Sequence, residues 1–358
     1  MSYQIGLDTL HLRPTPRVAH TDYCSNDALK RRLGVRSSAL GPAEQQFGTA
    51  HEDNPDTPRF EDAWEMDLIW ITHDGPGSWA ERGRVTDMGH GDFLEGGTDR
   101  RTARPSPFKD VEDVWAFDAE KEYGVPDAAQ LVPFFDDYYQ TGQRDFPNQI
   151  YTGGYYKTLI SGAIEAFGWE MLLEAASDPV RFDKVLDSFF RLSMHYFLAW
   201  SKTSIEAFIC HDDIVWTQGP FMHPDLYRRS IFPRYRALWD VLKKAGKKIL
   251  YCSDGDLTQF LPDIAQAGAD GFIFEPLTSF GAAVAQFGQT HVIVGSKLDC
   301  RTLTFGTRAD IQRQIDETLR IAKQCPGFMF AVGNHIPSNV PVENALYYFD
   351  YLKKNWQR

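Results

Sequence analysis

The second half of the chain alternates short apolar runs with longer amphipathic stretches. The apolar runs cover residues 206–210, 247–251, 271–274, 291–295 and 328–332. Near-continuous apolar runs of this length are typical of parallel strands that are buried on both faces. The amphipathic stretches predict helices at 224–245, 256–267, 279–287, 308–324 and 341–355, several of them bounded by Pro or Gly. Strands that alternate with helices through short connections indicate a parallel α/β fold.

The first half is less regular but completes the strand count. It predicts strands at 17–22, 66–72 and 148–153, and helices at 155–176 and 179–203. Eight strands are the number that a (β/α)8 TIM barrel needs. Residues 73–147 are rich in Gly, Asp, Arg and Pro, and we expect them to form an inserted region with short local structure in the N-terminal half. No linker divides the chain, so we expect residues 1–358 to form a single barrel domain.

Composition narrows the class of protein. The 358 residues are 43% hydrophobic and carry a net charge of −12, which is unfavourable for binding nucleic acid. No apolar run is long enough for a membrane span, and the N-terminus does not resemble a signal peptide, so a cytoplasmic location is expected. The five cysteines include no CxxC pair, which argues against a disulfide framework and against a zinc ribbon.

Titratable or metal-binding side chains follow five successive predicted strands. Active sites of parallel barrels lie at the C-terminal ends of the strands. Helix N-caps favour Asp and Ser, which explains Asp256, but not the recurrence of His, Cys, Lys and Glu at these positions. The residues predicted to be catalytic are Asp213, Asp254, Glu275, Asp299 and His335. The residues predicted to bind substrate are His211, Tyr156, Gln218, Lys297 and Asn334.

Structural interpretations stay open for several of these residues. Cys252 is as well explained as a small buried apolar side chain, and Asp254 before Gly255 as a turn residue. Lys297 would be a surface charge in that interpretation, although its place after an apolar strand favours an inward orientation. The arginines of the inserted region fit a solvated surface better than an anion-binding lid, and core packing suits most of the aromatic residues near the strand ends.

Five segments of the chain resemble a known superfamily. They read AASDPVRFDKVLD, ICHDDIVWTQGPFMHPDLYRRSIFPRY, KKAGKKILYCSDGDL, GSKLDCRTLTFGT and GNHIPSNVPVENALYYF. In order and spacing they resemble the superfamily of uroporphyrinogen decarboxylase and the corrinoid-linked methyltransferases, over roughly residues 155–355. The resemblance implies a (β/α)8 barrel.

The decarboxylase branch implies an N-terminal loop of the RQAGR type, whose arginines hold the carboxylate arms of the tetrapyrrole. That loop is absent here, where the stretch after the first strand reads TDYCSNDALKRRLG. Asp22 stands where the essential acidic residue of the decarboxylases would lie. Uroporphyrinogen decarboxylation is therefore the alternative function.

The methyltransferase branch implies zinc, bound by a His-x-Cys pair and a distant Cys. Here the pair reads Cys252-Ser253-Asp254, and Asn334 followed by His335 occupies the distant position. Either Cys252, Asp254 and His335 hold a metal weakly, with His211 or Glu275 as further candidates, or carboxylates and imidazole serve hydrogen bonding and proton transfer. We expect at most weak, exchangeable zinc.

Our primary hypothesis is a methyltransferase-like enzyme that moves a methyl group between a small methylated substrate and a corrinoid or folate carrier. The corrinoid would reside on a partner protein, because the chain has no DxHxxG-type corrinoid-binding segment. A non-catalytic barrel that acts as a partner protein is a second alternative, although the charged residues after five strands argue against it.

Overall fold

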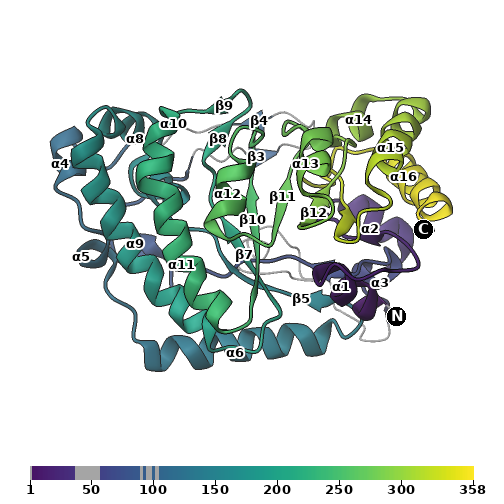
Figure 1. Cartoon of the computed structure of the whole chain (residues 1–358), viewed down its shortest axis with the longest axis horizontal. Helices are drawn as coiled ribbons and strands as arrows, with labels where there is room; N and C mark the ends of the chain where they lie inside the picture. Colours follow the sequence, from purple (N-terminus) through teal and green to yellow (C-terminus); the bar gives the residue numbers. More distant parts are fainter. Residues whose placement is uncertain (1, 37–56, 89–91, 94–98, 101–104) are drawn as a thin grey trace.

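Eight parallel strand positions surround one axis. The computed structural model describes residues 2–36, 57–88, 92–93, 99–100 and 105–358 (Figure 1). The strands are β1 (Ala19–His20), β2 (Leu68–Ile69), β5 (Ile150–Tyr151) continued by β6 (Gly153–Tyr155), β7 (Ala207–His211), β10 (Lys248–Ser253), β11 (Gly271–Phe274), β12 (Val292–Gly295) and β13 (Phe328–Phe330). Each one coincides with a segment that the hydrophobic pattern predicts.

Hydrogen bonds link these strands into a closed ring. One parallel sheet has the order β1-β13-β12-β11-β10-β7-β6, and β5, which leads into β6, pairs in parallel with β2. The ring closes where the Asp67 amide donates to the carbonyl of His20 over 2.8 Å, which joins β2 to β1. The predicted (β/α)8 barrel is confirmed.

Side chains alternate between the barrel axis and the surrounding helices. On β7, Ala207 and Ile209 face the interior, whereas Phe208 and Cys210 face outward. Small and branched residues from the other strands fill the interior together with Leu10 of the first helix, which covers the N-terminal end of the barrel. This alternation with a period of two residues decides which side chains reach the C-terminal mouth.

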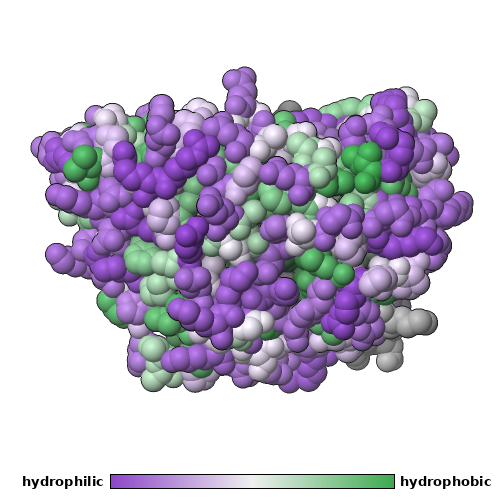
Figure 2. Space-filling view, viewed as in Figure 1, coloured by the Kyte–Doolittle hydropathy of each residue, from purple (hydrophilic) through white to green (hydrophobic). Residues whose placement is uncertain are grey.

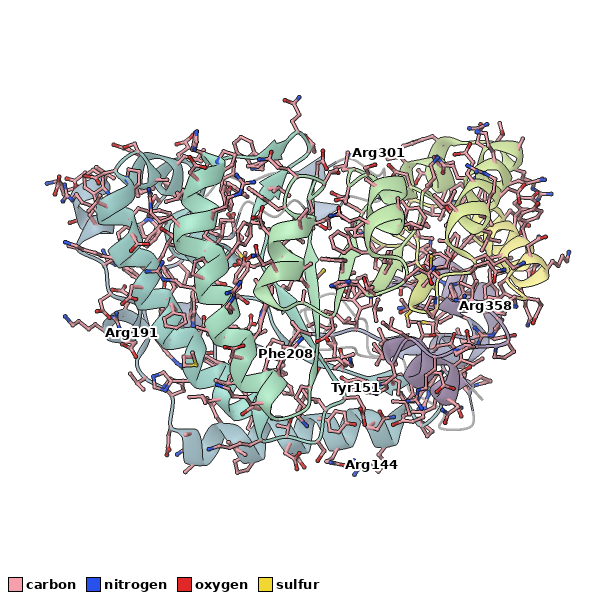
Figure 3. The ribbon with its side chains drawn as sticks, viewed as in Figure 1. Arg144, Tyr151, Arg191, Phe208, Arg301 and Arg358 are labelled. Atoms are coloured by element: carbon pink, nitrogen blue, oxygen red, sulfur yellow. The ribbon has the colours of Figure 1, made fainter. Side chains whose placement is uncertain are left out.

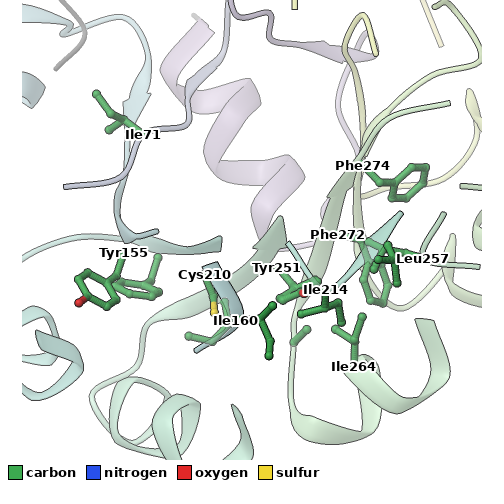
Figure 4. Close-up of a cluster of buried hydrophobic side chains, with 14 of the residues drawn as sticks. Ile71, Tyr155, Ile160, Cys210, Ile214, Tyr251, Leu257, Ile264, Phe272 and Phe274 are labelled. Atoms are coloured by element: carbon green, nitrogen blue, oxygen red, sulfur yellow. The ribbon is translucent and has the colours of Figure 1, made fainter. Parts of the chain in front are cut away.

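Helices surround the strands and bury a continuous apolar layer against them. The helices of the second half are α9 (Pro179–Ser201), α10 (Pro224–Leu226), α11 (Phe232–Lys244), α12 (Leu261–Ala267), α13 (Phe280–Phe287), α14 (Cys300–Phe305), α15 (Arg308–Ala322) and α16 (Val342–Asn355). Figure 4 shows part of this layer, in which Tyr251, Phe272 and Ile264 pack between strands and helices. On the face shown in Figure 2, the outer surface is mostly hydrophilic, with scattered apolar residues.

The first half contributes further helices and short strands. They are α1 (Ser2–Leu10), α2 (Asp27–Leu33), α3 (Phe60–Ala63), a 3₁₀ turn (Trp79–Glu81), β3 (Asp92–Phe93), β4 (Asp99–Arg100), α4 (Val111–Trp115), α5 (Ala119–Tyr123), α6 (Ala128–Asp145), α7 (Ile160–Phe167) and α8 (Trp169–Ala176). A hairpin of β8 (Val215–Trp216) and β9 (Gly219–Pro220) follows β7. No helix among the described residues combines the length and apolar character of a membrane span.

Three predicted elements differ from the structure. The helix expected over 155–176 begins only at Ile160 and is interrupted at Gly168, whose φ of 75° is unfavourable for other residues. The helix expected over 224–245 contains a π-helical turn, Tyr227–Ile231. Residues 73–147 contain more than short local structure, because α6 is 18 residues long and packs against α9.

A buried ion pair stabilises the junction between β1 and β2. The Arg17 guanidinium donates to both carboxylate oxygens of Asp67, at 2.6 and 2.8 Å, and stacks 4.2 Å from the ring centre of Trp356. Burial raises the pKa of Asp67 in spite of Arg17, so the pair does not fully offset the cost of burying its charges. The pair therefore joins β1 and β2 through a buried, bidentate contact.

A second buried carboxylate holds the loop after β7 against α7. Asp212 is fully buried and accepts hydrogen bonds from the Ser161 amide at 2.6 Å, the Ile160 amide at 3.2 Å and the Tyr235 hydroxyl at 2.5 Å. Burial raises the pKa of Asp212 to about 6. The charge of Asp213 also raises this pKa, whereas the hydrogen bonds lower it. The folded protein therefore binds a proton here more tightly than the unfolded chain does.

We predict that Asp212→Asn removes a pH-dependent part of the stability. Because the folded pKa of about 6 exceeds the unfolded value, this contribution is present at low pH and is lost as the pH rises through 6. Between pH 5 and 7.5, the free energy of unfolding of the native protein should fall by about 1 kcal/mol more than that of the Asn variant. Urea unfolding at the two pH values measures this difference. Asp212→Ala, which removes the acceptor altogether, should cost about 1–3 kcal/mol at both pH values. Identical pH dependence in the native protein and the Asn variant would refute the assignment.

Candidate active site

The C-terminal ends of the strands surround a small hollow with an accessible volume of about 30 Å³, which opens in part to solvent. Its lining residues are Tyr23, Trp70, Cys252, Ser253, Asp254, Ile273, Phe274, Glu275, Val294, Gly295, Ala331, Val332 and Asn334. Four of the residues proposed from the sequence, Cys252, Asp254, Glu275 and Asn334, therefore meet at one cavity. Inward-facing apolar side chains of the barrel form its floor.

Asp213 lies behind this lining and connects three elements. Its carboxylate accepts hydrogen bonds from the Tyr156 hydroxyl at 2.9 Å and from the Asp254 amide at 3.0 Å. The Nε2 atom of His211 lies 3.3 Å from the same carboxylate, and the Tyr156 ring packs 4.2 Å from the His211 ring. The Asp213 amide donates to the Ser161 hydroxyl at 2.8 Å, so α7 positions this loop.

The charges of Asp213 and His211 stabilise one another. Burial alone would raise the pKa of Asp213, but the charge of His211 and the hydrogen bonds of Asp213 outweigh it and lower the pKa to about 2. Burial lowers the pKa of His211, whereas Asp213 raises it, and the net shift is upward. The pair therefore favours a carboxylate against a protonated imidazole.

Asp254 and Glu275 present their carboxylates to the hollow from neighbouring strands. The side chain of Asp254 is exposed within the hollow although it lies deep in the molecule. The surrounding protein raises its pKa to about 7, and the charges of Asp213 and Glu275 add to this rise. Burial likewise raises the pKa of Glu275, which accepts a hydrogen bond from the Gly255 amide at 2.7 Å. Asp254 thus changes charge near neutral pH.

Gly255 lets the loop after β10 lie close to the β8–β9 hairpin. Its φ is 86°, and a Cβ atom there would lie 2.7 Å from the backbone oxygens of Val215 and Trp216. The loop after β10 can therefore lie against the β8–β9 hairpin only with glycine at this position. The sequence suggests a simple turn at Asp254-Gly255, and the structure shows that this turn also packs against the hairpin, where the Asp256 amide donates to the carbonyl of Trp216 at 2.9 Å.

Cys252 and Asn334 also line the hollow, whereas His335, next to Asn334, is not among its lining residues. Burial raises the pKa of the Cys252 thiol well above its usual value, and the neighbouring Asp254 adds to the effect. Burial lowers the pKa of His335 to about 4; its Nδ1 contacts the Asn334 side-chain oxygen and its ring lies 5.9 Å from the Tyr23 ring. In the described part of the chain, no three His, Cys, Asp or Glu side chains converge as a metal site would require.

Three further residues proposed from the sequence lie away from the hollow and from the Asp213 cluster. Asp299 caps α14 by accepting from the Arg301 amide at 2.8 Å, on the rim where Figure 3 places Arg301. Lys297 does not point inward as expected but pairs with Glu317 of α15, because the regular alternation ends with β12 at Gly295. Gln218 is exposed between β8 and β9.

The sequence interpretation missed the aromatic side of the mouth. Tyr23 and Trp70 follow the first and second strands, and their ring centres lie 6.2 Å apart. Their signal was the same as that of the later strands, namely a polar or aromatic residue immediately after an apolar run. It was overlooked because β1 and β2 are only two residues long.

Asp22, the residue in the position of the decarboxylase acid, does not line the hollow. It is buried and accepts hydrogen bonds from Trp64 Nε1 at 2.8 Å, the Tyr348 hydroxyl at 2.9 Å and the Val332 amide at 2.8 Å. His20 Nε2 lies a further 2.9 Å from it. Both carboxylate oxygens are thus engaged in joining β1 to β13 and α16.

Comparisons with known proteins agree with this architecture. The uroporphyrinogen decarboxylase (URO-D) family model matches residues 161–355. Uroporphyrinogen decarboxylases from Pelobacter propionicus and Geobacter sulfurreducens are 25% and 24% identical over 62% and 65% of this chain. These matches span 65% and 69% of the relatives' own lengths, and a similar protein from Citrifermentans bemidjiense is matched over 50% of its length.

Among solved structures, a methyltransferase from Methanosarcina mazei has the same fold. It superposes with a TM-score of 0.67, covers 99% of this chain and 98% of its own, and is 16% identical in sequence. The similarity in fold therefore extends beyond the segment that the family model matches. The match of the family model to more than half of the sequence shows that the chain belongs to the uroporphyrinogen decarboxylase family.

Proposed function

We propose that the protein is a methyltransferase that moves a methyl group between a small methylated substrate in the hollow and a corrinoid or folate carrier. The corrinoid would be supplied by a partner protein. The observation that carries this proposal is the lining of the hollow, which combines carboxylates and apolar groups. No Lys or Arg is present among the lining residues in the part of the chain that the structure describes.

This lining disfavours a substrate with many carboxylates. A tetrapyrrole with eight carboxylates would meet Asp254 and Glu275, with Asp213 behind them, and like charges at short range repel. Decarboxylation of uroporphyrinogen remains the second candidate, because the family model and the curated relatives carry that name. The engagement of Asp22 in the core counts against it.

The residues of the chain have distinct roles in the proposed reaction. Asp254 contacts the substrate and can exchange a proton with it near neutral pH, because its pKa is raised to about 7. Asp213, His211 and Tyr156 position the Asp254 loop from behind. The apolar floor, with Ile273, excludes water from the reacting methyl group. The carrier, when bound, supplies the electron pair that receives the methyl group.

The residues present do not fit the zinc site of the methyltransferase branch. The Cys252 thiol must lose its proton to bind zinc, and its raised pKa opposes this loss. His335 faces Asn334 and Tyr23, and Cys252, Asp254 and His335 do not form a converging set. We therefore assign no step of the reaction to zinc.

We predict that the protein does not convert uroporphyrinogen III at a useful rate. The acidic mouth should exclude the substrate, so less than about 1% of the turnover of an authentic decarboxylase is expected under the same conditions. Anaerobic incubation followed by chromatography of the porphyrins measures the products. Stepwise appearance of products with seven to four carboxyl groups would establish the second candidate instead.

We predict that Asp254→Asn lowers methyl transfer by about a hundredfold or more, because an amide can neither gain nor lose the proton. The assay offers small O-, N- and S-methyl compounds with reduced free cobalamin as acceptor and follows methylcobalamin by absorbance. Asp256→Asn is the matched control, since Asp256 bonds locally to the Thr258 amide and Asn can accept the same bond. Equal rates in both variants would exclude Asp254 from the reaction, and no transfer with any compound would contradict the proposed function.

Removing metal should leave the activity unchanged. We expect less than one equivalent of zinc per chain in protein purified without chelator, and the same activity after dialysis against a chelator. Elemental analysis of the native protein and of Cys252→Ala measures the content. One equivalent that disappears in the variant would restore the thiolate–zinc mechanism.

A further inference from the structure

His73 follows the second barrel strand and faces the helical layer. Ile69 and Ile71 face outward, and the period of two residues turns His73 to the same side. The His73 amide donates to the carbonyl of Gly154 at 3.0 Å, which joins this part of the chain to β6. The imidazole ring therefore lies on the outer side of the barrel wall and not in the lining of the hollow.

Three aromatic rings of α6 surround the imidazole. Its ring centre lies 5.0 Å from that of Phe134, 6.2 Å from that of Phe135 and 4.5 Å from that of Tyr138. Phe135 in turn stacks 4.2 Å from the ring of Trp200 on α9. His73 therefore joins α6 to the barrel wall.

A hydrogen bond inside the turn of residues 73–75 decides which nitrogen of His73 carries a proton. The Gly75 amide donates to Nδ1 of His73 at 3.1 Å. Because a backbone N–H can only donate, Nδ1 holds no proton and the ring is neutral, with its proton on Nε2. Gly75 has a φ of 91°, and a Cβ atom there would lie 2.8 Å from the Tyr196 ring, so the turn has little room to move.

A proton on the imidazole would oppose this arrangement. Burial lowers the pKa of His73, whereas the charge of Asp74 raises it, and the net shift is downward. Lys157 lies 3.9 Å from the Asp74 carboxylate and reduces its effect on the ring. Among the described residues of α6, the titratable group in contact with the ring is Tyr138. Protonation would set two donors, Nδ1 and the Gly75 amide, against each other.

The same turn reaches the mouth of the barrel through three successive hydrogen bonds. Asp74 accepts from the Tyr156 amide at 3.0 Å, and the Tyr156 hydroxyl donates to Asp213 at 2.9 Å. Asp213 in turn accepts from the Asp254 amide at 3.0 Å. A displacement of the turn therefore removes a support of Tyr156, which itself supports the residues at the mouth.

We propose that His73 is an acid-sensitive latch, whose neutral imidazole holds α6 and the turn of residues 73–75 on the barrel and whose protonation releases both. In the released form the exposed ring binds a proton as an ordinary histidine does, so acid shifts the equilibrium toward release. Release withdraws Asp74 from Tyr156 and loosens the support of Asp213. The latch does not depend on which reaction takes place at the mouth.

Amide hydrogen exchange of the whole protein at pH 7.5 and at pH 5.5 tests the latch, with each rate divided by the intrinsic rate at that pH. An exposed histidine has its ordinary pKa of 6.5, so the released form should gain about five- to tenfold in population over this range. The segments 73–75 and 128–138 should lose protection by that factor. Unchanged protection of both segments in the native protein would overturn the proposal.

His73→Asn is the decisive variant, because its side-chain oxygen can accept the Gly75 amide in place of Nδ1 but takes up no proton in this pH range. Its protection should be the same at both pH values. Phe134→Leu keeps the imidazole and loosens its surroundings, so it should lose protection at both pH values and retain the native pH dependence. The matched control is His223→Asn, since the exposed His223 accepts the Asp225 amide at 3.3 Å through its own Nδ1. This control should behave as the native protein does, and a native pH dependence in His73→Asn would refute the latch.

The amide of Tyr156 reports whether the latch reaches the mouth. In the native protein its protection should fall between pH 7.5 and pH 5.5 together with that of segment 128–138, and in His73→Asn both should stay constant. A Tyr156 amide that keeps its protection while α6 is released would refute the connection through Asp74.

Discussion

The alternation of side chains on closed parallel strands is the constraint on which the site depends. Asp212 and Asp213 are adjacent in the chain, yet one turns to the helical layer and the other toward the mouth. The first then serves as an anchor for α7, with a fully buried carboxylate, and the second connects Tyr156, His211 and the Asp254 loop. A shift of one residue in the register of β7 would exchange these roles, because the period of a strand is two residues.

Several carboxylates lie at the mouth of the barrel. Burying their charge costs free energy, which contacts elsewhere in the barrel offset. Asp213 keeps a low pKa because His211 and two hydrogen bonds stabilise its charge, whereas burial and the charges of Asp213 and Glu275 raise the pKa of Asp254 to about 7. The pKa values of these two carboxylates therefore shift in opposite directions. Such divergence is common where acid–base chemistry or cation binding is needed. The buried networks around Asp67 and Asp22 lie on the other side of the barrel and hold β1, β2 and β13 together.

The family of the chain does not by itself decide which reaction it catalyses, because that depends on the chemistry of the mouth. The barrel and the family follow from the fold and from the matched segment, and both are compatible with decarboxylation and with methyl transfer. The choice between them depends on the charge and shape of the hollow. There the carboxylates of Asp254 and Glu275, with no Lys or Arg among the described lining residues, are unfavourable for a substrate with many negative charges.

The sequence by itself determined the eight strands and most of the later helices, because buried parallel strands need apolar runs and their helices need amphipathic ones. It also identified Cys252, Asp254, Glu275 and Asn334, since residues directly after such strands must lie at one end of a barrel. Only the tertiary structure decided that Lys297 turns outward to Glu317, that Gly168 divides a helix, and that Tyr23 and Trp70 complete the hollow. These outcomes depend on contacts between segments far apart in the chain, and local pattern carries no information about which partner a side chain meets.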